Sequence, residues 1–361
     1  MLRANIYKIV CFFLFISNTI FSQTANPDKY KYVFTVAKDG SGDYSNIQDA
    51  IDAMRVFSLA PITLYIKAGV YNEKIDLSAN KTDVRFIGEN ADKTIITFDD
   101  YSGKGKLQTF NSYTAKISGN RFVAENISFV NSAGRVGQAI ALYVDADEAV
   151  FKKCKFIGNQ DTIYLGGEAS KQYFVDCHIE GTTDFIFGPA TAVFQNCEIV
   201  CKLNSYITAP NTTKGKEFGF VFLDCKVAVI SEVSKVYLGR PWRAWAKSVF
   251  IRCELPGQIA SEGWDNWSNT ENERTVFFAE YNCTGVGFKP KERVSWSHQL
   301  KKSEAKRYTL KNILSPKSKK KRGLNGTFIK SRDGIKCIGK GSIFAIKTSL
   351  FYKYIKMNYQ S

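Results

Sequence analysis

Short apolar runs recur along the chain in one repeated pattern. Each unit has an aromatic residue, two further residues, a cysteine, one residue and an apolar residue. The pattern occurs in FKKCKF (151–156), FVDCHI (174–179), FQNCEI (194–199), FLDCKV (222–227) and FIRCEL (250–255). FVAENISF (122–129) and VFFAEYNC (276–283) resemble the same unit, with Asn126 at the expected cysteine position in the first. Successive cysteines lie 20 to 28 residues apart, which is typical of a solenoid of stacked strands.

The alternation within each unit predicts where the cysteines lie. In a strand, the cysteine and the apolar residue two positions later face the same side, so successive coils place cysteine over cysteine in the interior. We therefore expect a buried ladder of small hydrophobic side chains rather than a disulfide framework. A single disulfide between neighbouring coils, such as Cys177 with Cys197, is the alternative that stays open if the geometry permits it.

One amphipathic helix is predicted before the repeats, in SNIQDAIDAM (45–54). Ser45 and Gln48 have capping-box spacing. The apolar stripe of this helix consists of Ile47, Ala50, Ile51 and Met54. A stack needs its first coil covered, so we expect this helix to close the end of a stack of about ten coils between about residues 60 and 290.

The first 22 residues resemble a secretory signal peptide. Arg3 and Lys8 precede the apolar run from Ile9 to Ile16, which is too short to span a bilayer. We expect a secreted protein, extracellular or periplasmic, with an uncleaved anchor as the alternative. No later segment reads as a transmembrane helix, and no stable membrane insertion is expected.

The net charge of +16 is concentrated at the C-terminal end. Residues 301–361 contain 17 Lys and Arg against 2 acids, whereas residues 1–300 contain 33 against 32. We interpret residues 315–361 as a flexible basic extension. Such an extension could hold the protein near an acidic polymer, a membrane surface or nucleic acid, or be simply solvated.

The residue inventory excludes several kinds of active site. The chain has two histidines, His178 and His298, and no G-x-S-x-G motif, so a serine hydrolase triad is poorly supported. C-x-x-C and H-E-x-x-H are also absent from the sequence, which disfavours zinc. Carboxylates remain as the candidate catalytic groups.

Two aspartates occupy comparable positions on consecutive units. Asp161 lies in NQDTIY (159–164) and Asp184 in GTTDFIFG (181–188), 23 residues later. Strands of adjacent coils are about 4.8 Å apart, so the two carboxylates can be neighbours on one face. Neighbouring like charges raise one pKa, which leaves one protonated acid beside one ionised group. The alternative is that each aspartate merely caps a turn.

A third segment, LGRPWRAW (238–245), favours the catalytic interpretation. The fork of donors on Arg240 suits a carboxylate, and Trp242 with Trp245 offers flat faces for sugar rings. Gln138 and Gln160 are neutral amide donors that can stabilise an oxyanion. A hydrophobic cap with a surface arginine is the alternative interpretation of 238–245.

Five ordered segments together resemble the pectin methylesterase (pectinesterase) family of carbohydrate esterases. They are GVYNE (69–73), GQAIAL (137–142), NQDTIY (159–164), GTTDFIFG (181–188) and LGRPW (238–242). The resemblance extends from about Val33 to Leu314 and ends near Ser315. It implies an all-β protein, a single-stranded right-handed parallel β-helix with an N-terminal capping helix, over a domain from 30 to 314.

The resemblance also implies a role for each candidate residue. Asp184 would be the nucleophile on the C6 methyl ester of a galacturonate unit, and Asp161 the general acid and base. Gln138 and Gln160 would hold the oxyanion, and Arg240 would orient Asp184. The substrate-binding residues would be Trp242, Phe187, Arg243 and Tyr164. No metal or organic cofactor is implied.

The implied partner is methyl-esterified homogalacturonan, or pectin, with no nucleic acid, and the protein is expected to be a monomer. Two alternatives stay open at the level of sequence. One is a non-catalytic pectin-binding β-helix, and the other is a pectate lyase or polygalacturonase on the same fold. A lyase would need a cluster of calcium-binding acids and a free basic group.

Overall fold

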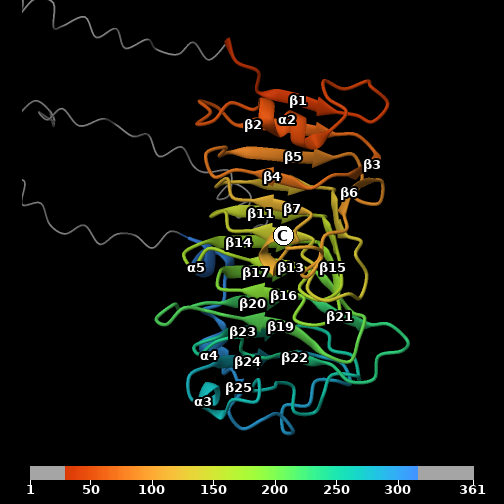
Figure 1. Ribbon diagram of the computed structural model, residues 1–361. Coiled ribbons are helices and arrows are strands. Elements are labelled where there is room, and N and C mark those ends of the chain that lie inside the picture. Colours follow the sequence, from red (N-terminus) through yellow and green to blue (C-terminus); the bar gives the residue numbers. More distant parts are fainter. Residues whose placement is uncertain (1–28, 316–361) are drawn as a thin grey trace, which may run out of the picture. The chain divides into compact units, whose positions relative to one another are not determined.

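A computed structural model describes residues 29–315 (Figure 1). The predicted signal peptide (1–22) and all but the first residue of the predicted basic extension (315–361) lie outside the described residues. The chain separates after Lys31 into a short N-terminal unit and a main unit that begins at Tyr32. The strands of the described residues all lie in the main unit.

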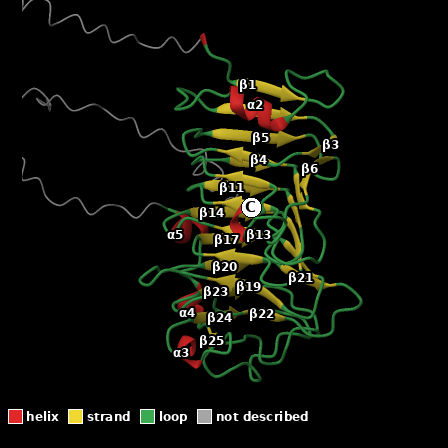
Figure 2. Cartoon of the chain, viewed as in Figure 1, coloured by secondary structure: helices red, strands yellow, loops and turns green. Residues whose placement is uncertain are grey.

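The fold consists of three parallel sheets and very little helix (Figure 2). Sheet A has 11 strands, and sheets B and C have seven each. Sheet A contains β1 (Val33–Val36), β2 (Ile62–Ile66), β5 (Val84–Gly88), β8 (Val123–Glu125), β11 (Ala149–Lys152), β14 (Lys171–Val175), β17 (Thr191–Gln195), β20 (Phe220–Leu223), β23 (Lys247–Ile251), β24 (Phe277–Tyr281) and β25 (His298–Gln299).

The other two sheets follow the same order along the chain. Sheet B contains β3 (Gly69–Asn72), β6 (Thr94–Phe98), β9 (Ser128–Asn131), β12 (Lys155–Ile157), β15 (His178–Gly181), β18 (Glu198–Cys201) and β21 (Lys226–Val229). Sheet C contains β4 (Ile75–Leu77), β7 (Ala115–Ile117), β10 (Leu142–Val144), β13 (Ile163–Leu165), β16 (Ile186–Gly188), β19 (Tyr206–Pro210) and β22 (Tyr237–Gly239).

Each complete coil gives one strand to every sheet and then returns to the first. Thus β11, β12 and β13 form one coil, and each pairs in parallel with β14, β15 and β16 of the next. Parallel connections of this kind are right-handed, and the fold is a right-handed parallel β-helix, which confirms the expected fold class. The stack begins earlier than predicted, at β1 instead of near residue 60, because β1 pairs along its whole length with β2.

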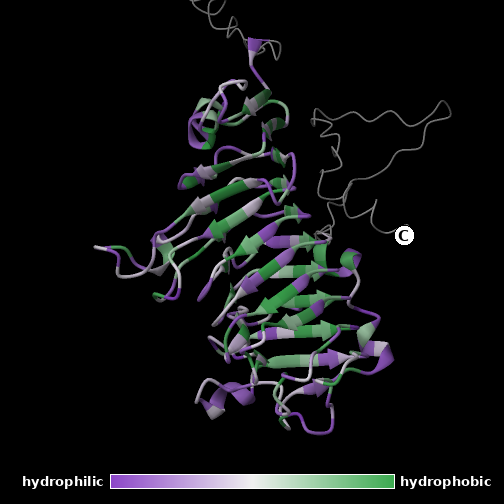
Figure 3. Cartoon of the chain, turned by 90° about the vertical axis from the view of Figure 1, so that its right-hand side faces the viewer, coloured by the Kyte–Doolittle hydropathy of each residue, from purple (hydrophilic) through white to green (hydrophobic). Residues whose placement is uncertain are grey.

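Hydrophobic residues are concentrated along the strands (Figure 3). The aromatic residues of the repeat stack on one another inside the coils. Ring centroids of consecutive pairs are 4.3 to 4.8 Å apart in the series Phe151, Phe174, Phe194, Phe222 and Phe250. These rings and the residues around them form one continuous core.

The predicted cysteine ladder is confirmed. All seven described cysteines are buried free thiols, which excludes the Cys177–Cys197 bridge in this structure. In the ladder itself each Sγ donates to a carbonyl oxygen of the preceding coil at 3.4 to 3.6 Å. The ladder thiols are Cys154, Cys177, Cys197, Cys225, Cys253 and Cys283. A small apolar side chain with one weak donor fits this corner between sheets A and B.

The assignment of Asn126 to the cysteine position is wrong by one residue. Phe151 pairs with Ala124, so the residue opposite Cys154 is the buried Ile127. Asn126 instead matches Lys153, and both have positive φ, 58° and 50°. The residue before each ladder position adopts this left-handed conformation, which Asn and Asp tolerate better than most residues.

The helix predicted at the N-terminal end is α2 (Ile47–Ala53). Its stripe of Ile47, Ala50, Ile51 and Met54 is buried, as expected. The predicted capping box is wrong, because the N-cap is Asn46 and makes no side-chain cap. The carboxylate of Glu73, in the coil below, accepts from the backbone N–H groups of Ile47 and Gln48 at 2.8 and 3.1 Å.

Three further helices were not predicted: α3 (Thr270–Glu273), α4 (Lys302–Ala305) and α5 (Leu310–Leu314). A 3₁₀ turn, η2, covers Thr109–Asn111. In α5, Leu310, Ile313 and Leu314 are buried against the outward face of sheet A. Within residues 29–315 no helix is long and apolar enough to cross a membrane.

Candidate active site

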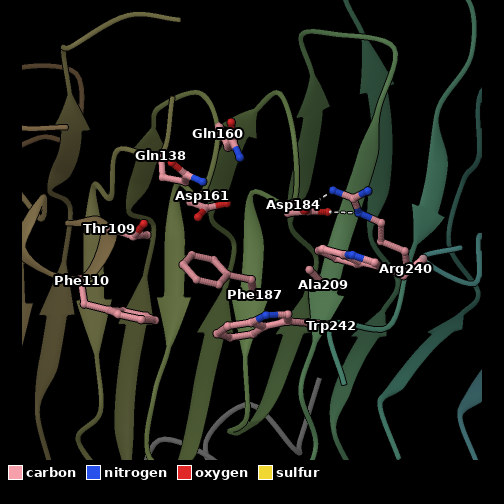
Figure 4. Close-up of a pocket in the computed structure, with 11 residues that line it drawn as sticks. Thr109, Phe110, Gln138, Gln160, Asp161, Asp184, Phe187, Ala209, Arg240 and Trp242 are labelled. Carbon is pink, nitrogen blue, oxygen red and sulfur yellow. Dashed lines mark hydrogen bonds and ion pairs between the residues drawn. The ribbon is translucent and has the colours of Figure 1, made fainter. Parts of the chain in front are cut away.

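Asp161 and Asp184 occupy the same position on consecutive coils of sheet C. Asp161 precedes β13 and Asp184 precedes β16, and the two strands pair Ile163 with Ile186. Both aspartates have positive φ, 65° and 50°. Backbone strain of this kind persists where the surrounding structure over-determines it, as at active sites. The two residues are 8% and 5% exposed and line one cavity of about 240 Å³ (Figure 4).

Two glutamines line the same cavity. Gln138 and Gln160 pair across consecutive coils in a parallel bridge, in the segments that lead into β10 and β13. Ala139 N–H donates to the Gln160 carbonyl at 3.1 Å, which fixes the register of the two segments. Both side chains appear beside Asp161 in Figure 4.

Arg240 binds Asp184 through two parallel hydrogen bonds. Nε donates to Oδ1 at 3.0 Å, and the second nitrogen donates to Oδ2 at 2.7 Å (Figure 4). Arg240 follows β22 directly, and its backbone N–H donates to the Thr208 carbonyl at 2.9 Å. The fork matches the two oxygens of a carboxylate, so this pair fixes both the position and the orientation of Asp184.

The two carboxyl groups differ in their partners. The pKa of Asp161 is raised to about 8, first by burial and then by the charge of Asp184, while the charge of Arg240 partly lowers it. Burial also raises the pKa of Asp184, but hydrogen bonds and charge from Arg240 counteract that rise. Among residues 29–315 no cation forms an ion pair with Asp161. Asp161 therefore holds the proton at neutral pH, and Asp184 is the group stabilised as an anion.

Apolar and aromatic residues form the rest of the cavity wall. Phe187, Ala209 and Trp242 line it beneath the carboxylates, with Phe110 at the opposite side (Figure 4). The rings of Phe187 and Trp242 have centroids 5.9 Å apart. A wall of this kind suits the apolar faces of a sugar ring and lowers the local dielectric around the carboxyl pair.

Three predicted sugar-binding residues lie outside this cavity. Tyr164 lies beside Phe187, its register partner on the adjacent strand, with ring centroids 5.0 Å apart. Arg243 lines a neighbouring cavity of about 390 Å³ that also contacts Trp242. Trp245 lines neither cavity, and its ring lies under the Lys214 ammonium at 4.8 Å.

Sequence reasoning missed five residues of the site. Tyr206 packs against Arg240, and the residues that line the cavity are Thr109, Phe110, Ala209 and Trp267. None belongs to the repeated cysteine unit. The one available signal for Trp267 was the pair of tryptophans in GWDNWS (263–268), after the FIRCEL unit.

The arrangement suits acyl transfer at an ester. It offers a paired carboxylate, a protonated carboxyl group and two amides around one space with an apolar floor. A carboxylate can attack a carbonyl carbon, a neighbouring acid can protonate the leaving oxygen, and amides can hold the oxyanion. Within the described residues no three His, Cys, Asp or Glu side chains gather as a metal-ligand set.

Comparisons with known proteins agree with this chemistry. The family model described as Pectinesterase matches residues 33–317. Pectinesterase 31 of Arabidopsis thaliana is 37% identical over 292 residues, which cover 78% of this chain and 92% of that protein. This chain spans about half the length of other Arabidopsis relatives, named as probable pectinesterase/pectinesterase inhibitor proteins.

Solved structures show the same similarity. The pectin methylesterase from carrot superposes with a TM-score of 0.74 at 32% identity, covering 81% of this chain and 94% of that one. A pectin methylesterase crystallised in complex with a hexasaccharide superposes with a TM-score of 0.70 at 29% identity, covering 78% of this chain and 96% of that one.

Proposed function

This chain belongs to the pectinesterase family, and we propose that it hydrolyses the C6 methyl esters of polygalacturonate with Asp184 as nucleophile and Asp161 as general acid and base. The observation that carries this assignment is the shared cavity of the two aspartates, in which only Asp184 is paired with a cation. The substrate is pectin, and the products are pectate and methanol.

The reaction divides into two acyl-transfer steps. In the first, an Asp184 oxygen attacks the C6 carbonyl, and Gln138 and Gln160 donate hydrogen bonds to the developing oxyanion. The tetrahedral intermediate collapses as Asp161 protonates the departing methoxide, which leaves as methanol and leaves a mixed anhydride on Asp184. In the second step, Asp161 takes a proton from water, hydroxide adds to the anhydride, and Asp184 departs as carboxylate.

The electrostatics of the site support this division of roles. A nucleophile must be ionised, and Arg240 stabilises the anionic form of Asp184 through its two hydrogen bonds. A proton donor must be protonated at the working pH, and the raised pKa of Asp161 meets that requirement. The bidentate pair also explains why a buried carboxylate is tolerated beside Phe185, which is fully buried.

Substrate binding extends across two adjacent cavities in this proposal. Trp242 and Phe187 support the sugar that carries the ester, and Tyr164 packs beside Phe187 on the adjacent strand. Arg243 faces the neighbouring cavity and forms no ion pair with any residue in 29–315. We place there an adjacent galacturonate whose carboxylate binds the Arg243 guanidinium.

The cellular setting and the ends of the chain follow from the sequence. We propose that residues 1–22 direct export, that the enzyme domain covers 30–314, and that residues 315–361 are a basic extension. The protein then acts outside the cytoplasm as a monomer, without a cofactor or metal.

Product analysis tests the reaction class. Purified protein is incubated with methylated polygalacturonate, and methanol, unsaturated ends and new reducing ends are measured in the same sample. We expect methanol alone. Unsaturated or new reducing ends without methanol would identify a chain-cleaving enzyme, and folded protein that binds the polymer but releases none of the three would identify a binding protein.

A further inference from the structure

The guanidinium of Arg240 lies between two aromatic rings. Its central carbon is 3.9 Å from the centroid of the Tyr206 ring and 3.7 Å from that of Trp267. Its edge meanwhile donates both hydrogen bonds to Asp184. With both faces covered and one edge engaged, the guanidinium has little freedom to rotate toward water.

The position of Tyr206 is itself fixed by the fold. Tyr206 is the first residue of β19 and pairs with Tyr237 of β22 in register. The two tyrosine rings stack at 5.4 Å with an interplanar angle of 24°, and the Lys235 ammonium lies 5.1 Å from the Tyr237 centroid. One continuous stack of rings and cations therefore runs from Lys235 through Tyr237, Tyr206 and Arg240 to Trp267.

Tyr206 also contacts the nucleophile through its backbone. Its carbonyl accepts a hydrogen bond from the Asp184 N–H at 2.9 Å. The Tyr206 side chain does not line the catalytic cavity, whereas Trp267 does. An effect of the Tyr206 ring on the reaction would thus pass through Arg240 and not through contact with the sugar.

We propose that Tyr206 is a positioning residue, whose ring, opposite Trp267, clamps Arg240 in the plane from which it donates both hydrogen bonds to Asp184. This inference rests on the proposed role of Asp184 as nucleophile. An arginine that is exposed on one face loses rotamer entropy when it is held in a single geometry. Water also competes with the carboxylate for the N–H donors of that arginine. Two aromatic faces remove both costs, because they exclude water and attract the cation.

Removing one face should loosen the pair and change the titration of Asp184. The charged and titratable groups around Asp184 are Arg240, Asp161, Asp265 and the Tyr206 phenol. Arg240 is the cation that lowers the pKa of Asp184, whereas burial and Asp265 raise it. A looser Arg240 therefore leaves more Asp184 protonated and inactive at low pH, so the acidic limb of the pH profile moves to higher pH.

The test compares Tyr206→Leu with Tyr206→Phe and with the control Tyr65→Leu. Tyr65→Leu removes an exposed tyrosine from β2 of sheet A, outside the catalytic cavity. For Tyr206→Leu we expect kcat for methanol release to fall about tenfold with little change in KM, and the acidic limb of kcat/KM to rise by about half to one pH unit. Tyr206→Phe keeps the ring and should restore both, and Tyr65→Leu should keep the wild-type profile.

Two further measurements keep this result interpretable. Tyr206→Met keeps an unbranched apolar side chain without a flat face, and is assayed beside Tyr206→Leu in case the branched residue disturbs β19. Circular dichroism establishes that each variant is folded. A folded Tyr206→Leu or Tyr206→Met with wild-type kcat and an unmoved acidic limb would overturn the clamp, as would an equal shift in Tyr65→Leu. A fully active Asp184→Asn would overturn the proposed function itself.

Discussion

At the scale of single residues, two aspartates with almost the same burial are given different chemistry by their neighbours. Asp184 receives two hydrogen bonds from Arg240, whereas Asp161 has no ion-pair partner among residues 29–315. Their spacing follows from the repeat, so the sequence alone could bring them together. The identity of the clamp around Arg240 could not be predicted, because Tyr206 and Trp267 reach it from separate segments.

Asp161→Asn should stabilise the protein above pH 8 even as it lowers activity. The pKa of Asp161 in the folded state is about 8, above its ordinary value of 3.8. The folded state therefore binds more protons than the unfolded state between these values, and stability falls as pH rises through that window. Asparagine cannot ionise, so we expect the free energy of unfolding of the variant at pH 9 to exceed that of wild type by at least about 1 kcal/mol.

Urea unfolding of wild type and Asp161→Asn at pH 3.5 and pH 9 measures this difference. The two proteins should have similar midpoints at pH 3.5, where Asp161 is protonated in both the folded and the unfolded state. Asp145→Asn is a suitable control, because it removes a carboxylate of sheet C outside the catalytic cavity. Equal midpoints for wild type and Asp161→Asn at pH 9 would contradict a raised pKa.

At the scale of secondary-structure elements, the repeat predicts the strands of each coil but not the turn between sheets A and B. The aromatic and cysteine positions were correctly placed inside, because strand alternation fixes them. The first unit was placed one residue off because its aromatic and cysteine positions hold Ala124 and Ile127, so the local pattern does not mark the register. The C-terminal helices were missed because α4 and α5 are too short for a periodic signal.

The cysteine ladder should resist alkylation in the native protein. Every ladder thiol is buried, and burial raises the pKa of Cys154 to about 12. Since the thiolate is the reactive form, both access and ionisation protect these groups. Peptide mass spectrometry after iodoacetamide treatment should find the ladder peptides unlabelled in native protein and fully labelled in denaturant. Native labelling of Cys225 at the denatured rate would show that the ladder is open.

The hydrogen bonds that Glu73 accepts from the N-terminus of α2 should contribute measurably to the free energy of unfolding. Glu73→Ala leaves the N–H groups of Ile47 and Gln48 without their acceptor, which should cost about 1 kcal/mol. Glu73→Gln keeps one acceptor oxygen and should lose less. Chemical unfolding of the three proteins checks the order. A Glu73→Ala variant as stable as wild type would mean that another group, or water, satisfies the helix end.

At the scale of the whole molecule, the five family motifs are far apart in sequence, and the coil brings four of them into the cavity. Gln138, Asp161 and Asp184 come from three successive coils, and Arg240 follows β22, two strands beyond β16 in sheet C. GVYNE instead caps the N-terminus of α2, because the Glu73 carboxylate accepts a hydrogen bond from the Ile47 N–H. Phe110 could not be predicted as part of the wall, because η2 lies in a segment outside the repeat.

The basic C-terminal residues should affect binding to pectate without affecting turnover. Residues 301–361 carry 17 Lys and Arg against 2 acids, and the catalytic groups lie well before them. A protein ending at residue 317, where the family match ends, should keep the full-length kcat. Its affinity for pectate should be less salt-dependent than that of the full chain. Equal salt slopes for the two proteins would show that the groove and not the extension attracts the polymer.

The most direct test of the account is the rate constant of methanol release by folded Asp184→Asn on methylated polygalacturonate, beside wild type and Arg274→Gln, an exposed charge variant away from the cavity. Asparagine keeps the shape of the side chain and removes the nucleophilic oxygen anion, so kcat should fall by at least about a thousandfold while Arg274→Gln matches wild type. A folded Asp184→Asn that releases methanol within about tenfold of the wild-type rate would contradict nucleophilic attack by Asp184.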